Sequence, residues 1–405
     1  MNPCLALGLA AALLSAPAVH AQRYDPTLLL DWAERQYPGL FPGPQADRSA
    51  PPYVYRHYPA SGHYLGVAGD DVAVLGPITG QVLQTVGTLA DWECQVLPAR
   101  CAAPGMAARR AAAAAAASTD PACVTAQPFH WSVGDAGGRL AEGSVGSGAP
   151  QADTVMAIAS ASKWLYAGYV AERRGGTPTA DDRSLLNFTS GWTGFDICLP
   201  GQTVAQCQSY DGLVFHNGGY DASHVGRFNY SGGHMQKHAL LMGLGDHANA
   251  ALGREIGGVL GIDMSYTQPQ LAGGVATSAT QYGRYLQRLT AGRLQMAQLL
   301  QADAVCTNPA TCPGAVYSPV GGLYSWHYAW GHWIEDDPAT GGDGAFSSAG
   351  AFGFYPWLDA GRTWWGIVAR RTEDELGAGQ DQRPARESAA CGARIRAAWI
   401  SGRTP

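Results

Sequence analysis

Apolar and polar residues follow two periods along the chain, and the period changes from strand-like to helical and back. Alternating runs at 129–133 and 139–143 stand on either side of Gly137-Gly138, which predicts a β-hairpin. A second strand pair is predicted at 352–355 and 363–369, around Asp359-Ala360-Gly361. Helices are predicted at 160–174, 238–244, 248–260, 280–289 and 386–400. Strands at both ends of a helical insertion indicate an α+β fold rather than a repeating βαβ one.

An earlier part of the chain, residues 22–102, has a pattern of its own. Apolar positions within 26–37 have the spacing of a short amphipathic helix. Strand-like runs follow at 53–55, 63–67 and 72–75, with Gly69-Asp70-Asp71 as a hairpin turn between the last two. We therefore expect a small N-terminal α+β module.

Two further segments complete the predicted organisation. Residues 1–21 have an apolar run and a small-x-small end before Gln22, which is typical of a signal peptide. Residues 103–120 contain an unbroken run of alanine, which offers no bulky face to a core, and we interpret them as a linker. The main domain is then 121–405.

Composition narrows the functional classes. The chain of 405 residues is 46% apolar and 14% charged, so it has ample material for a core. The formal charge of −6, without a basic patch, argues against nucleic acid as a partner. Beyond the signal, no stretch is long and apolar enough to span a bilayer. We expect an exported protein, periplasmic or secreted, whose oligomeric state the sequence leaves open.

The cysteines agree with export. Nine are present, and Cys4 would be removed with the signal, leaving an even number as in oxidising compartments. Proximity favours three pairs, Cys94–Cys101, Cys198–Cys207 and Cys306–Cys312. Cys123 and Cys391 remain, and we predict that they join the two ends of the main domain.

Candidate chemistry begins with the lysines. Only two of the 26 basic residues are lysine, and one of them, Lys163, follows Ser160 by three positions. On a helix this spacing places both side chains on one face. A lysine can lose its proton when it is buried, which arginine cannot, so its amine can activate a serine. By itself the Ser-x-x-Lys spacing is common.

Other motifs follow in a fixed order. Residues 228–233 read Phe-Asn-Tyr-Ser-Gly-Gly, 273–278 read Gly-Gly-Val-Ala-Thr-Ser, and 328–334 lead to Ser348-Ala349-Gly350. Residues 185–191 read Leu-Leu-Asn-Phe-Thr-Ser-Gly. In the order and spacing of these motifs, the chain resembles the serine β-lactamase and penicillin-binding superfamily. The resemblance is to its class C-like esterase and amidase branch, which includes nylon-oligomer hydrolases. The resemblance covers about residues 125–400 and implies an antiparallel sheet flanked by helices.

The resemblance also implies roles for single residues. Ser160 would be the acylated nucleophile at the amino end of a helix, and Lys163 would accept its proton or hold a neighbouring base. Tyr230 would pass a proton to the leaving group, with a pKa lowered by Lys163. The backbone N–H groups of Ser160 and Ala351 would form the oxyanion hole.

Two positions depart from that family's pattern. Gly232 stands where the family has asparagine, and Ser348 stands where it has lysine or histidine at the start of the triplet that ends in Gly350. We expect Gly232, Ser348 and Gly350 to contact the substrate. Without the polar groups that hold β-lactams and peptidoglycan stems, the site favours a neutral ester or amide.

No metal or organic cofactor is expected. His234 and His238 are interpreted as a solvated helix face, because no third ligand is evident. Asp336, Asp337 and Asp343 lack EF-hand spacing and are interpreted as a polar loop.

The sequence thus predicts an exported serine hydrolase that cleaves an ester or amide, small or oligomeric, on Ser160. Two alternatives stay open, a DD-peptidase or β-lactamase, and a catalytically silent binder of cell-wall or polymer fragments.

Overall fold

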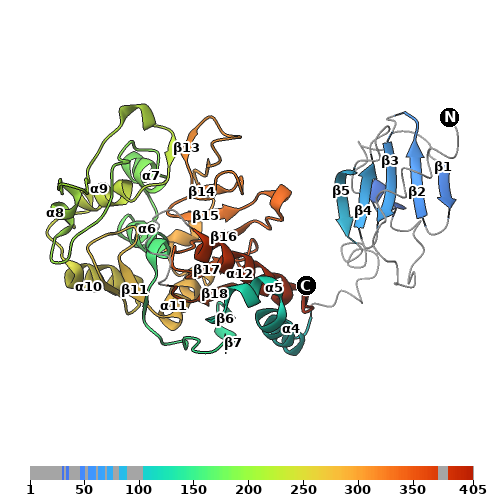
Figure 1. Cartoon of the computed structure of the whole chain (residues 1–405), viewed down its shortest axis with the longest axis horizontal. Helices are drawn as coiled ribbons and strands as arrows, with labels where there is room; N and C mark the ends of the chain where they lie inside the picture. The colour runs from blue at the N-terminus through green and yellow to red at the C-terminus, as the bar shows by residue number, and fades with distance from the viewer. Residues whose placement is uncertain are drawn as a thin grey trace. The chain divides into compact units, whose positions relative to one another are not determined.

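The computed structural model describes residues 30–31, 33–35, 46–50, 53–60, 63–68, 71–75, 82–88, 104–372 and 382–404. The chain divides into two compact units, Met1–Pro104 and Gly105–Pro405 (Figure 1). The expected signal peptide and the expected Cys94–Cys101 bridge lie outside the described residues. Within the described part, no helix is long and apolar enough to cross a membrane.

The first unit contains a five-stranded antiparallel meander. Its strands pair in chain order: β1 (Ala46–Ala50), β2 (Tyr53–Tyr58), β3 (His63–Ala68), β4 (Asp71–Leu75) and β5 (Val82–Thr88). Residues 30–31 and 33–35 are helical, as their apolar spacing predicts. Tyr58 and Leu65 are fully buried.

The second unit is built on an eight-stranded antiparallel sheet. In spatial order its strands are β12 (Val305–Cys306), β14 (His327–Ala329), β15 (His332–Glu335), β16 (Ala345–Ser347), β17 (Tyr355–Leu358), β18 (Trp365–Ala369), β6 (Phe129–Asp135) and β7 (Gly138–Val145). The first and last parts of the domain therefore meet where β6 pairs with β18. Short strands form two further sheets: β8 (Met156–Ala157), β10 (Ser265–Tyr266) and β11 (Val275–Thr277) in one, β9 (Phe228–Asn229) and β13 (Ala315–Tyr317) in the other.

Helices cover both faces of the large sheet (Figure 1). The α-helices are α4 (Met106–Thr119), α5 (Pro121–Ala126), α6 (Ser162–Arg173), α7 (Ala180–Leu186), α8 (Val204–Gln208), α9 (Gly233–Leu241), α10 (Asn249–Leu260), α11 (Ala279–Thr290) and α12 (Arg383–Ser401). Short 3-10 helices are η2 (Ala159–Ala161), η3 (Ala222–His224), η4 (Gln295–Gln298) and η5 (Pro338–Thr340). The predicted α+β class, with an antiparallel sheet and a helical insertion, is confirmed.

Alternate side chains of strand β18 pack into the two cores on opposite faces of the sheet. Trp365 and Ile367 belong to the core that includes α6 and α11, whereas Val368 belongs to the core beneath α12. The alternation follows from the two-residue period of a strand. The predicted strand at 352–355 is wrong over most of its length, because residues 351–353 form a turn and β17 begins only at Tyr355.

The alanine-rich segment is a helix rather than the expected linker. Ala113, Ala116 and Ala117 of α4 are fully buried, in cores shared with Trp399 and Ala398 of α12. Small side chains allow the two helices to approach closely, while the larger residues of α12 fill the interface. A run of alanine can therefore provide a core face when its partner supplies the bulk.

Disulfides close three parts of the second unit. Cys123–Cys391 joins α5 to α12 across 268 residues, and Cys198–Cys207 and Cys306–Cys312 close short loops. All three were predicted, and the structure confirms them.

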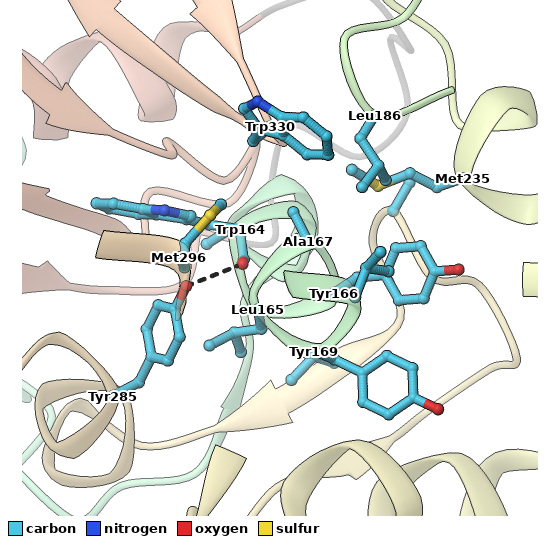
Figure 2. Close-up of a cluster of buried hydrophobic side chains, with 14 of the residues drawn as sticks. Trp164, Leu165, Tyr166, Ala167, Tyr169, Leu186, Met235, Tyr285, Met296 and Trp330 are labelled. Carbon is cyan, nitrogen blue, oxygen red and sulfur yellow. Dashed lines mark hydrogen bonds between the residues drawn. The ribbon is translucent and has the colours of Figure 1, made fainter. Parts of the chain in front are cut away.

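Helix α6 lies at the centre of the larger core (Figure 2). Residues 162–171 are buried on every side of the helix, and the Tyr285 hydroxyl donates to the Trp164 carbonyl at 3.1 Å. Gly331 allows the backbone after β14 to pass close to α6, since a Cβ at this position would stand 2.6 Å from the Lys163 carbonyl oxygen. Packing from all directions fixes the helix that follows Ser160.

Candidate active site

Ser160 lies in the 3-10 turn that leads into α6. The residue before it, Ala159, has a φ of 44°, a left-handed conformation that costs about 1–3 kcal/mol in a residue with a side chain. The Ser162 hydroxyl donates to the Ala159 carbonyl at 2.6 Å and accepts from the Val275 N–H at 3.2 Å. The surrounding structure thus imposes a strained backbone beside Ser160, a feature that clusters at functional sites.

Lys163 meets Ser160 as the spacing predicted. Its Nζ lies 2.9 Å from the Ser160 Oγ and 2.8 Å from the Ala272 carbonyl oxygen. The side chain is buried, and the described residues place no carboxylate within ion-pair distance of it. Burial without a counter-charge lowers the pKa of Lys163 from 10.5 to about 7. A large fraction of this amine is therefore neutral near pH 7 and able to accept a proton.

Tyr230 reaches the same point from the other side. The Ser160 side chain is near enough to the Tyr230 phenol to lower the phenol's pKa, and the Lys163 Nζ lies 4.8 Å from the centre of the Tyr230 ring. The ring stacks on Trp333 at 5.3 Å, and the Tyr230 N–H donates to the Tyr317 carbonyl at 3.0 Å. Hydroxyl, amine and phenol thus converge, although 70 residues separate Ser160 from Tyr230.

The expected lowering of the Tyr230 pKa is wrong. Burial raises the pKa well above its usual value of 10, and the Ser160 side chain offsets only part of this effect. A lysine whose pKa is about 7 is only partly protonated near neutral pH, so it supplies little positive charge to stabilise a phenolate. Tyr230 therefore rests as a phenol, and Lys163 is the group suited to accept the serine proton.

The Ser160 and Ala351 amides, which are expected to form an oxyanion hole, belong to two segments that pass side by side. A Cβ on Gly350 would stand only 2.1 Å from the Ile158 carbonyl oxygen, so the turn containing Ala351 passes directly beside the chain that leads to Ser160. Among residues 104–372, neither the Ser160 nor the Ala351 N–H donates to a backbone carbonyl. Both donors are available to another acceptor, and their role in an oxyanion hole stays a prediction.

The three predicted substrate contacts differ in what they offer. Ser348 lies beside Ser160, but its hydroxyl donates to the Ser160 carbonyl at 3.2 Å, so it supports the backbone there. Gly350 allows the close approach of the turn described above. Gly232 precedes α9, and a Cβ there would stand 3.0 Å from the Phe195 ring. The space beside Gly232 is therefore bordered by an aromatic ring.

The interpretation of His234 and His238 as solvated is wrong, because both are fully buried. His234 bonds the Ser190 hydroxyl at 2.6 Å and the Asn229 carbonyl at 3.0 Å, and burial lowers its pKa to about 4. His238 bridges the Tyr166 hydroxyl and an Asp182 carboxylate oxygen, each at 2.8 Å. A helix that packs on both sides buries positions that an exposed helix leaves in water.

The three aspartates without EF-hand spacing each contact another residue of the protein. Asp343 pairs with Arg396, Asp336 pairs with His327, and Asp337 accepts the Ser325 N–H at 2.8 Å. No cluster of three or more metal-ligating side chains occurs among the described residues.

Sequence reasoning missed two contributors to the site. The Ala272 carbonyl holds Lys163, and a backbone acceptor leaves no mark in the sequence. Trp333 supports the Tyr230 ring; it lies in the recognised 328–334 segment, but its contact with Tyr230 crosses 103 positions and appears only after folding.

Comparison with known proteins gives similarity of structure alone. No family model and no curated protein matches the chain. One similar solved structure is a β-lactamase from Mycobacterium bovis, with 17% sequence identity, a TM-score of 0.43 and a match that covers 68% of this chain and 96% of that one. Two others each have 14% identity and a match that covers 71% of this chain and 99% of the other chain. They are the hydrolase EstCE1, described as having promiscuous acyltransferase activity (TM-score 0.48), and a D-stereospecific amidohydrolase from a Streptomyces species (TM-score 0.45). The chemistry proposed below rests on the side chains of this chain.

Proposed function

We propose that the protein is an exported serine hydrolase that cleaves a carboxylic ester or amide through an acyl-enzyme on Ser160. The observation that carries the proposal is the position of the Ser160 hydroxyl, 2.9 Å from a buried amine that has no carboxylate partner and close to the partly buried phenol of Tyr230. A serine is a weak nucleophile unless a neighbouring base takes its proton. Lys163 has the position and the lowered pKa for that task.

The proton transfers follow from the resting states. Ser160 Oγ attacks the substrate carbonyl carbon, and its proton passes to the neutral Lys163 Nζ. The carbonyl oxygen becomes an oxyanion, which the Ser160 and Ala351 N–H groups would stabilise. As the tetrahedral intermediate collapses, Tyr230 donates its phenolic proton to the leaving group and regains one from the Lys163 ammonium. Water then enters, and the same groups return the acid product and free Ser160.

The groups around the nucleophile favour a neutral substrate. Gly232 offers no side chain, and the Ser348 hydroxyl is bonded to the protein backbone. A DD-peptidase or β-lactamase is the runner-up within the class of serine hydrolases. Hydrolysis of a chromogenic short-chain ester, but not of a chromogenic cephalosporin, is the expected result.

Export is proposed from the predicted signal at 1–21 and agrees with the three disulfides.

A fluorophosphonate probe tests the proposal without knowledge of the natural substrate. It should label the native protein on Ser160, and Ser160→Ala should abolish both labelling and ester turnover. Absence of labelling in the folded native protein would support the alternative of a catalytically silent binder.

A further inference from the structure

Three consecutive apolar side chains stand in solvent at the tip of one hairpin. The relative exposure is 102% for Leu213, 74% for Val214 and 44% for Phe215. The tip is a closed turn, since the Gly212 N–H donates to the Phe215 carbonyl at 3.0 Å. Single exposed apolar residues are ordinary, but a contiguous group marks an interaction site. We call residues 213–215 the apolar finger.

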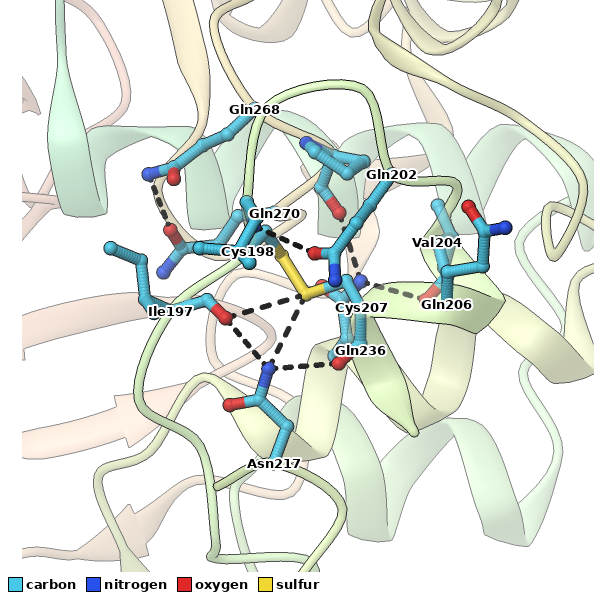
Figure 3. The surroundings of a disulfide bond; sticks show 12 residues. Ile197, Cys198, Gln202, Val204, Gln206, Cys207, Asn217, Gln236, Gln268 and Gln270 are labelled. Carbon is cyan, nitrogen blue, oxygen red and sulfur yellow. Dashed lines mark hydrogen bonds between the residues drawn. A yellow bond between two sulfur atoms is a disulfide. The ribbon is translucent and has the colours of Figure 1, made fainter. Parts of the chain in front are cut away.

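The base of the finger is firmly held (Figure 3). The Asn217 side-chain N–H₂ donates to the Ile197 and Cys207 carbonyls, each at 2.8 Å, beside the Cys198–Cys207 disulfide. The His216 N–H donates to an Asp196 carboxylate oxygen at 2.7 Å. These contacts maintain the exposed turn in one conformation, so the fold preserves the apolar finger.

A series of isolated contacts follows the chain from the finger to the proposed catalytic centre. Gly194 and Gly219 form a backbone bridge, and next to it the Tyr220 ring lies tilted against Trp192 with the ring centres 5.1 Å apart. The Ser231 hydroxyl donates to the Thr193 carbonyl at 2.7 Å, immediately after Tyr230 in sequence. Residues 213–230 therefore join the finger to Tyr230, and contacts with residues 192–194 hold this segment along the way.

The size of the finger limits what it can bind. An aromatic side chain buries roughly 150–250 Å². Leu213 and Val214 are smaller than that and Phe215 is only 44% exposed, so the three together give well under about 750 Å². A stable protein dimer needs about 800 Å² from each partner, with a much broader outline. The finger suits shallow, reversible adsorption onto a continuous apolar surface.

Nearby charge indicates that this surface is uncharged. Asp211 and Asp221, which precede and follow the finger in sequence, have side chains that are 83% and 47% exposed, and they lie beside His216 at 2.6 Å and His224 at 3.5 Å, respectively. Each histidine offsets at most the charge of its own carboxylate, so these two pairs carry no net positive charge that would attract an anionic membrane.

We propose that the apolar finger docks the enzyme onto the surface of a water-insoluble, uncharged ester and holds the catalytic centre there. The inference rests on the proposed function and deepens it, because it names the physical state and class of the substrate. Hydrolysis of dissolved esters needs no such docking, whereas hydrolysis at an ester–water interface does.

The test compares dissolved p-nitrophenyl acetate with emulsified tributyrin, using the full chain with its disulfides intact. The variant L213S/V214S/F215S should keep kcat/KM on p-nitrophenyl acetate within twofold, since its changes lie in solvent. On the emulsion it should lose at least tenfold in rate and no longer be depleted from solution by the droplets. The matched control V124S/L241S/I400S, which changes exposed apolar residues on α5, α9 and α12, should behave as wild type in both assays.

Several results would overturn the inference. Wild-type rate and adsorption of the finger variant on tributyrin would do so, as would finger-dependent binding to anionic vesicles in place of ester droplets. A wild-type dimer in gel filtration that dissociates in the finger variant would instead identify a self-association surface. If the wild type hydrolysed no ester at all, the proposed function would fail, and adsorption to the droplets would still decide whether the finger docks there.

Discussion

At the scale of single residues, the two lysines of the chain have different surroundings. The Lys163 Nζ is buried against a hydroxyl and a carbonyl, whereas the Lys237 Nζ lies 4.4 Å from the Trp192 ring, where a permanent positive charge is favourable. The same substitution at the two positions therefore separates loss of a neutral base from loss of a cation.

Lys163→Arg should lower kcat/KM on a dissolved ester by about 10²- to 10⁴-fold, the usual contribution of a general base, because arginine does not lose its proton. Lys237→Arg should stay within about twofold, since arginine also stacks on aromatic rings. Steady-state kinetics on both purified variants checks this. Equal rates for Lys163→Arg and wild type would remove Lys163 from the role of base.

Tyr230 is predicted to act as an acid, because its resting state is the phenol. Tyr230→Phe should therefore reduce kcat by about 10²- to 10⁴-fold for an alkyl ester, whose alkoxide leaves poorly. It should have a much smaller effect on a p-nitrophenyl ester, whose leaving group needs no proton. Parallel kinetics on the two esters measures the difference, and an equal loss on both would assign Tyr230 to another step.

At the scale of elements, sequence periodicity located four of the five helices predicted in the second unit to within one to three residues, and it missed the short helices α5, α7 and α8. Helix α10, predicted at 248–260, spans Asn249–Leu260, and α11, predicted at 280–289, spans Ala279–Thr290. Helix α9 was displaced: it begins at Gly233, where glycine and buried histidines conceal the amphipathic pattern. Helix α4 was misjudged because the bulk that completes its interface belongs to α12.

The packing of α4 is testable by overpacking. Ala113→Leu should lower the free energy of unfolding by about 1–3 kcal/mol, since the added volume meets a fully buried interface. Ala114→Leu, at the neighbouring exposed position, should change it by less than about 0.5 kcal/mol. Urea unfolding followed by tryptophan fluorescence measures the free energy of unfolding of both variants. If neither substitution changed it, residues 103–120 would be better described as a linker.

At the scale of the whole molecule, the ends of the second unit are joined twice, by pairing of β6 with β18 and by Cys123–Cys391. Motif order along the chain indicated that Ser160, Lys163 and Tyr230 meet. It did not indicate their protonation states, because these depend on burial by residues such as Trp333 that are distant in sequence.

Removal of the long-range bridge should matter more than removal of a short one. Replacing Cys123 and Cys391 by alanine should cost about 2–5 kcal/mol of unfolding free energy, because that bridge closes 268 residues. The same change at Cys198 and Cys207, which are nine positions apart, should cost less in the chain-entropy account. Urea midpoints of the two double variants give the comparison, and the reverse order would refute it.

The most direct test of the central claim is the pH dependence of the rate at which a fluorophosphonate labels Ser160. The pKa of Lys163 is lowered by folding, so the amine is protonated and inactive below about pH 7 and neutral above it. The rate constant should therefore rise through pH 7 to a plateau in the wild type, and this rise should be absent in Lys163→Arg. A rate without an inflection near pH 7, or the same profile in both proteins, would contradict the account.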